Sequence, residues 1–161
     1  MTNLQRNIKR VLIFLACLAI PLGVGFVSYL IIRNDLDIYN TLNLPFFAPP
    51  AITFSIIWPI LYSLMGISTF LIVMKQKKIE TASICVYAVQ LFFNFAWPIL
   101  FFISKLFLFS SIWLLALLFF IIWMIVNFFT VSKPAGYLQI PYLIWTVFAC
   151  ILNFTIFFLN I

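Results

Sequence analysis

Three apolar stretches of the sequence each place a tryptophan on one helical face with amide, phenol or small side chains. Residues spaced i, i+4 and i+7 or i+8 lie on the same face of an α-helix. The three sets are Trp58, Tyr62 and Met65; Gln90, Asn94 and Trp97; and Trp145, Ala149 and Asn153. Aromatic rings stack on flat apolar molecules, and amides supply neutral hydrogen bonds. If these faces converge, they predict an aromatic-walled pocket for a small hydrophobic ligand.

The amides in these stretches have a second interpretation. Polar side chains inside a membrane turn away from lipid, either toward a cavity or toward a neighbouring helix. On the second reading, four residues only join helices to one another: Gln90, Asn94, Asn127 and Asn153. On the first reading, the ligand-binding residues are Trp58, Tyr62, Gln90, Asn94, Trp97, Trp145 and Ala149. The spacing alone leaves both open.

The missing side-chain types exclude most catalytic chemistry. The chain has no histidine, and its apolar stretches contain no charged residue. Proton relays, ion coupling, metal hydrolysis and triad-type nucleophiles all need such groups. The three cysteines, Cys17, Cys85 and Cys150, fall in apolar stretches, which indicates packing rather than a disulfide or a metal site. We therefore predict no metal site and no obligate cofactor.

The elements that carry these faces are predicted membrane-spanning helices. Only 7% of the 161 residues are charged, against about 25% in soluble domains, and the mean hydropathy is +1.25. Five uncharged stretches are each long enough to cross a hydrocarbon core of about 30 Å. They cover residues 11–32, 52–74, 81–103, 107–130 and 137–160. The sequence thus predicts an all-α integral membrane protein, a single domain over residues 1–161 with a five-transmembrane-helix bundle.

Basic residues predict the orientation of this bundle. The first stretch is too long for the apolar core of a signal peptide, and we interpret it as a retained helix. An N-terminus in the cytoplasm leaves seven basic residues inside and only two, Arg33 and Lys105, outside. The charged turn at 75–80 is interpreted as a solvated connection. The net charge of +6 then reflects topology and anionic lipid rather than binding to nucleic acid.

Two further features bear on the pocket and on assembly. The loop at 33–50 is apolar and rich in proline, so it could fold over the bundle as a lid or anchor in the headgroups. Prolines that directly follow Trp58 and Trp97 predict kinks beside the pocket. Thr81, Cys85 and Ala88 form a small-residue face that could pack within the bundle or against a second copy.

The tryptophan-containing segments also resemble a known family. Residues 58–66 read WPILYSLMG, residues 90–102 read QLFFNFAWPILFF, and residues 141–145 read PYLIW, followed by Phe148-Ala149 and Leu152-Asn153. These segments, together with Tyr39, Leu42, Pro45 and Pro49-Pro50 of the loop, are similar to those of the tryptophan-rich sensory protein (TspO/MBR) family. That family includes the mitochondrial translocator protein, or peripheral-type benzodiazepine receptor. The resemblance covers roughly residues 20–155.

The resemblance implies a bacterial cell-membrane protein that is often a homodimer. It implies a pocket that binds porphyrins, such as protoporphyrin IX or haem, and drug-like apolar molecules. Carried over by position, the pocket adds Ser28 and Ile31 to the residues above. Three positions depart from the family. Phe154 stands at the aromatic position of the sterol-recognition stretch, but no lysine or arginine follows it. Ile52 and Phe109 occupy positions where tryptophan is common in relatives. Sterol recognition through this C-terminal stretch is therefore not expected.

Three functions follow from this inventory. The first is a membrane receptor or sensor for porphyrins. The second is light-dependent porphyrin degradation, in which Trp58 and Trp145 intercept excited or oxidised species and no proton-transfer group is needed. The third is a transporter of porphyrin or another hydrophobic small molecule. An odd number of helices without ion-coupling residues argues against transport.

Overall fold

A computed structural model describes residues 3–75 and 81–161, with side chains in the second range described from Cys85 onward. In these ranges it contains helices and no strand. The helices are α1 (Asn3–Ile32), α2 (Ile38–Thr41), α3 (Ile52–Lys75), α4 (Thr81–Pro98), a π-helix (Ile99–Ile103), α5 (Phe107–Val131), α6 (Lys133–Leu138) and α7 (Ile140–Leu159). Five spans, in which α4 joins the π-helix and α6 joins α7, are long and apolar enough to cross a membrane. The predicted all-α, five-helix membrane fold is confirmed.

Helix boundaries differ from the predicted stretches where polar residues or prolines occur. The first helix begins at Asn3 rather than at residue 11, because the polar residues before the apolar stretch are compatible with a helix. The last stretch begins earlier, at Lys133, with a proline near the start of α6. It is then interrupted at Gln139, and α7 restarts with Pro141 in its first turn.

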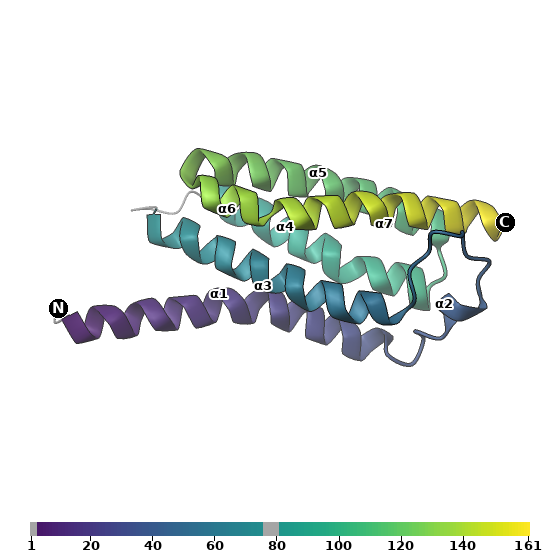
Figure 1. The fold of residues 1–161 in the computed structure, drawn as a ribbon, viewed down its shortest axis with the longest axis horizontal. Helices are drawn as coiled ribbons and strands as arrows, with labels where there is room; N and C mark the ends of the chain where they lie inside the picture. The colour runs from purple at the N-terminus through teal and green to yellow at the C-terminus, as the bar shows by residue number, and fades with distance from the viewer. Residues whose placement is uncertain (1–2, 76–80) are drawn as a thin grey trace.

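The helices pack side by side along the long axis of the molecule (Figure 1). α1 packs on α3, α5 packs on both α4 and α7, and α6 lies against α3 and α5. The start of α1, the end of α3 and the short α6 lie at one end of the bundle, and α2 and the chain's C-terminus lie at the other.

This arrangement gathers the basic residues that were predicted to be cytoplasmic. Lys75 ends α3, and Lys133 begins α6, at the same end as the basic start of α1. The grouping is compatible with a cytoplasmic N-terminus, which stays a prediction. Lys77, Lys78 and Glu80 of the predicted solvated turn lie outside the described residues. Of the small-residue face on α4, Cys85 and Ala88 are exposed, and the Thr81 side chain lies outside the described residues.

Small residues let α1 approach α3 closely. A Cβ atom built on Gly66 of α3 would lie 2.8 Å from both the Cys17 carbonyl oxygen and the Leu18 Cα of α1. Both atoms belong to the backbone, so they cannot move aside at low cost. Small residues at a helix contact are the usual means by which membrane helices pack, because lipid offers no hydrophobic drive for helix association.

We expect Gly66→Ala to lower the free energy of unfolding by about 1–3 kcal/mol, since the added methyl group separates α1 from α3. The thermal unfolding midpoint in detergent micelles, followed by circular dichroism, measures the change. Gly23→Ala is the matched control, because an added Cβ there meets nothing within 4 Å. Gly23→Ala should leave the midpoint unchanged or raise it, since alanine favours helix by up to about 1 kcal/mol. Equal midpoints for the two variants would contradict this account of the α1–α3 contact.

Candidate ligand-binding site

A cavity of about 740 Å³ lies between α1, α3 and α4, at the end of the bundle covered by the loop between α1 and α3. Its volume is within the range of about 300–1,000 Å³ that is typical of small-molecule sites. The lining is Leu22, Gly25, Phe26, Ser28, Tyr29 and Ile32 of α1; Leu36, Tyr39 and Ala51 of the loop; Ile52, Phe54, Ser55, Trp58, Pro59 and Tyr62 of α3; and Asn94, Trp97, Pro98 and Phe102 of α4 and the π-helix. None of these side chains is charged.

Aromatic rings form the inner wall of the cavity. Trp58 stacks on Tyr62, with ring centroids 5.7 Å apart and planes inclined by 29°. The same indole lies 6.3 Å from the Trp97 indole at an angle of 38°. Two neighbouring indoles on different helices thus give the cavity a broad apolar surface, suited to a flat ligand.

The π-helix, which begins directly after Trp97 and Pro98, contributes Phe102 to this wall. Pro98 has no N–H group to donate, so the regular α-helical bonding of α4 cannot continue through it. The following residues form a wider turn, closed by a bond from the Ser104 N–H to the Ile99 carbonyl. Trp97, the last residue of α4 before Pro98, is buried, as are Phe101 and Phe102 within the π-helix. Phe101 packs against both of the others, at 5.7 Å from Trp97 and 4.9 Å from Phe102.

A chain of buried hydrogen bonds fixes the floor of the cavity. The Tyr62 hydroxyl donates to Asn94 Oδ1 at 2.6 Å, and Asn94 Nδ2 donates to the Tyr142 hydroxyl at 2.7 Å. The Tyr142 hydroxyl in turn donates to Gln90 Oε1 at 3.0 Å. Finally, Gln90 Nε2 contacts Met65 Sδ at 3.3 Å. The chain connects α3, α4 and α7, and two of its members, Tyr62 and Asn94, also line the cavity.

A second amide holds Trp97 in place. The Trp97 indole N–H donates to Asn153 Oδ1 at 3.3 Å. Asn153 Nδ2 is placed to donate to the Ser110 and Ser111 hydroxyls of α5, at 2.9 and 2.6 Å, and to the Phe107 carbonyl at 3.0 Å. These contacts tie α4, α5 and α7 together behind the cavity wall.

The loop between α1 and α3 forms the roof. Tyr39 is buried, and its hydroxyl donates to the Pro49 carbonyl at 2.9 Å. Burial raises the pKa of the Tyr39 phenol, so it remains protonated and able to donate this bond at neutral pH. The same loop exposes Phe46 completely. The loop lies at one end of the cavity and also presents an outward aromatic side chain suited to the headgroup region, so the lid and the headgroup anchor both stay predictions.

The roof is also joined to the last helix. The Asn43 N–H donates to Asn160 Oδ1 at 2.9 Å, and Asn160 Nδ2 donates back to the Asn43 carbonyl at 3.1 Å. Asn43 Nδ2 adds a bond to the Leu159 carbonyl at 3.3 Å. We call these three bonds the Asn43–Asn160 clasp.

The structure brings only some of the predicted site residues to the cavity. Five line it: Ser28, Trp58, Tyr62, Asn94 and Trp97. Four do not: Ile31, Gln90, Trp145 and Ala149. Gln90 lies behind Asn94 in the hydrogen-bond chain, as the interhelical interpretation of the amides expects. Ile31 is 42% exposed, because the α1 face that lines the cavity contains Ser28 and Ile32 instead.

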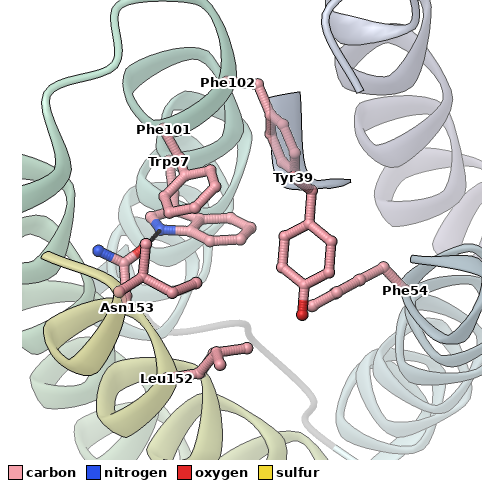
Figure 2. A pocket seen from close by; sticks show the side chains of 9 residues that line it. Tyr39, Phe54, Trp97, Phe101, Phe102, Leu152 and Asn153 are labelled. Carbon is pink, nitrogen blue, oxygen red and sulfur yellow. Dashed lines mark hydrogen bonds between the residues drawn. The ribbon is translucent and has the colours of Figure 1, made fainter. Parts of the chain in front are cut away.

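Trp145 is separated from the cavity by Phe54. The two rings make an edge contact at 5.8 Å, and the Trp145 indole N–H is buried without a hydrogen-bond partner in the described part of the chain. Ala149 borders a void of about 10 Å³, too small for more than one water molecule. Figure 2 shows Tyr39 and Phe54 facing Trp97, Phe101 and Phe102 around this void, with Leu152 and Asn153 of α7 beside them.

Most of the α1 wall and the roof lie outside the predicted site. Leu22, Gly25, Phe26 and Tyr29 recur at helical spacing and could have been recognised as one face. Their types gave no sign that this face borders a cavity rather than lipid. The sequence predicts Tyr39 only as part of a loop that resembles the family's, because loop sequences do not show which side chain turns inward.

The site offers no conventional catalytic chemistry. The cavity lining lacks an acid or base, and the described residues contain no group of three metal-binding side chains. Its hydroxyls and amides form hydrogen bonds without exchanging protons at neutral pH. The arrangement is suited to binding an apolar ring system.

Comparison with known proteins gives a consistent family assignment. The sequence model of the TspO/MBR family matches residues 16–159. A tryptophan-rich protein TspO of Chlorobaculum tepidum is 33% identical over 155 residues, which cover 94% of this chain and 98% of that protein. A tryptophan-rich sensory protein of Cereibacter sphaeroides is 32% identical, covering 92% and 90%. The translocator protein of sheep, Ovis aries, is 33% identical, covering 84% and 82%.

We expect Asn94→Leu to lower the free energy of unfolding by about 1–3 kcal/mol, because it leaves the buried Tyr62 hydroxyl without an acceptor. Chemical unfolding in mixed micelles measures the loss. The double variant Asn94→Leu/Tyr62→Phe should recover part of it, since the unpaired hydroxyl is then removed. Asn127→Leu on α5 is the control and should change stability by no more than about 0.5 kcal/mol. No recovery in the double variant would contradict the assigned role of the Tyr62–Asn94 bond.

Proposed function

This chain belongs to the TspO/MBR family, and from that premise we propose that it is a membrane receptor or sensor that binds a porphyrin, such as protoporphyrin IX or haem, in the cavity between α1, α3 and α4. The observation that carries the proposal is the cavity itself, with two indoles in one wall and a volume of about 740 Å³. The integral membrane character of the chain follows from the family and from its five apolar spans.

The neutral lining favours a ligand with an apolar body. A macrocycle can lie against Trp58 and Trp97, where it gains stacking and buried apolar area. Hydrogen-bonding capacity remains at Ser28, Ser55 and Asn94, which could orient a polar edge of the ligand. A charged body would lack a partner here, and burial of an unpaired charge is costly.

Carboxylates on the ligand must therefore lie at the loop end of the cavity, near water and headgroups. Arg33 directly follows Ile32, a lining residue of α1, and is exposed. Its guanidinium is the nearest cation along the chain to the cavity lining, although Asp35 and Asp37 reduce the local positive charge. This pattern suits a porphyrin, whose acidic groups extend from one edge of an apolar ring.

The Trp58–Trp97 pair supports a second candidate function, light-dependent porphyrin degradation. In this scheme the bound porphyrin absorbs light, dioxygen opens the ring, and the adjacent indoles intercept excited or oxidised species. Trp97 is better placed for this role than Trp145, which lies behind Phe54. Transport remains the alternative that uptake into sealed vesicles would test.

We expect Trp58→Phe to weaken protoporphyrin IX binding about tenfold, because a smaller ring loses stacking area. The Soret shift and the quenching of tryptophan fluorescence, titrated in detergent micelles, give the dissociation constant. Trp123→Phe is the matched control, since Trp123 is exposed on α5 and lies outside the cavity. If mixing the unmodified protein with protoporphyrin IX changes neither the Soret band nor the tryptophan fluorescence, the proposed function is wrong.

If degradation occurs, illumination in air should bleach the porphyrin at a rate that saturates with protein concentration. The double variant Trp58→Phe/Trp97→Phe should lose this protein-dependent component, whereas Trp123→Phe should retain it. Absorbance followed at equal bound porphyrin separates the reaction from weaker binding. Equal bleaching by the double variant would reduce the effect to ordinary photobleaching.

A further inference from the structure

The cavity has two boundaries through which a ligand could pass, and the roof is the firmly closed one. Tyr39, a residue of this loop, is buried, and its hydroxyl donates a hydrogen bond to the Pro49 carbonyl. The Asn43–Asn160 clasp ties the loop to the end of α7. The Tyr39 ring also makes an edge contact with Phe54 at 5.4 Å. Opening the roof would break these contacts together.

The side between α1 and α3 differs, because its lining residues are exposed. Phe26 and Tyr29 of α1 are 61% and 49% exposed, and Ile52 of α3 is 65% exposed, yet all three line the cavity. Ser55 and Pro59 continue the exposed α3 edge. In a membrane-spanning helix such exposure faces lipid. We call this opening, bordered by Phe26, Tyr29, Ile52, Ser55 and Pro59, the side window.

Contacts between α1 and α3 close the bundle below the side window. Toward the start of α1, Gly66 packs on the α1 backbone, and the Phe14 ring contacts Phe70 at 5.2 Å. At Gly25, an added Cβ would collide with the Tyr62 ring, so the helices are still in contact there. Beyond that contact lies Pro59, which has no N–H to donate to the Ser55 carbonyl and favours a bend in α3. The side window occupies the segment between this proline and the loop.

We infer that the cavity exchanges its ligand laterally with the bilayer, through the side window and in the leaflet on the loop side, while the roof stays shut. The inference rests on the proposed function, because it concerns how the ligand of that same site arrives. An amphiphilic, apolar-bodied ligand concentrates in the membrane, and its acidic edge would remain at headgroup level near Arg33. Entry from lipid then requires no transfer of the apolar body through water.

Narrowing the window tests the inference directly. The protein is placed in phosphatidylcholine nanodiscs, and protoporphyrin IX association and dissociation rates are measured by stopped-flow fluorescence. Ser55→Phe should lower both rates about tenfold, because a gate affects entry and exit alike. A variant that merely weakens binding would instead raise the dissociation rate. Ile56→Phe is the control, since Ile56 is exposed on α3 but does not line the cavity.

Widening the window gives the opposite expectation and guards against a misfolded Ser55 variant. Tyr29→Ala should raise both rates, whereas Leu30→Ala, exposed on α1 outside the lining, should change neither. Loss of a ligand contact alone would raise dissociation and leave association unchanged.

Loosening the roof distinguishes the competing route. Asn160→Ala removes the side chain of the clasp and should leave both rates unchanged. Faster association and dissociation in Asn160→Ala, with no effect of Ser55→Phe or Tyr29→Ala, would overturn the side window and assign exchange to the loop. Absence of any porphyrin signal in the unmodified protein would instead overturn the proposed function.

Discussion

Polar groups that enter a bilayer must find partners inside the protein, and this requirement organises the bundle around its cavity. The chain from Tyr62 through Asn94 and Tyr142 to Gln90 satisfies four side chains on three helices. Individual bonds of this kind contribute only about 0.6 kcal/mol on average in membrane proteins. Their geometric effect is larger, because one amide and two phenols fix the relative rotation of α3, α4 and α7. That rotation directs Trp58 and Trp97 toward the same space.

The same requirement explains why the site is neutral. Each amide near the cavity is held by protein partners, so the wall offers oriented dipoles and aromatic faces but no ionisable group. Such a wall discriminates by shape and stacking, and it leaves charged substituents to the membrane surface. The two candidate functions, porphyrin binding and light-dependent porphyrin degradation, need the same aromatic wall. The structure therefore favours one site for both candidate functions, and kinetics rather than geometry separates them.

Helical spacing made much of the α3 and α4 wall predictable. Trp58, Tyr62, Asn94 and Trp97 line the cavity because residues at i, i+3 and i+4 share a face. Periodicity does not show which gap between helices stays open. It therefore predicts Trp145 and Ala149 in the same pocket as the α3 and α4 residues, although Phe54 separates Trp145 from the cavity. The sequence of α1 is so uniformly apolar that it does not show which face of the helix turns toward the cavity. The predicted residue is therefore Ile31, whereas Ile32 lines the cavity. Pro98 predicts an irregularity in its helix but not that a π-helix follows it. The inward turn of Tyr39 depends on tertiary contacts that no local pattern encodes.

The Asn43–Asn160 clasp has a consequence for the order in which the protein is built. It joins residues 117 positions apart, so the roof receives its anchor only after α7 has been synthesised and inserted. Likewise, the Trp97 indole N–H finds its acceptor, Asn153 Oδ1, only at that stage. During translation the earlier helices hold an unfinished compartment, and a chain interrupted before α7 lacks both attachments. Completion of the cavity wall and roof thus coincides with assembly of the whole membrane domain.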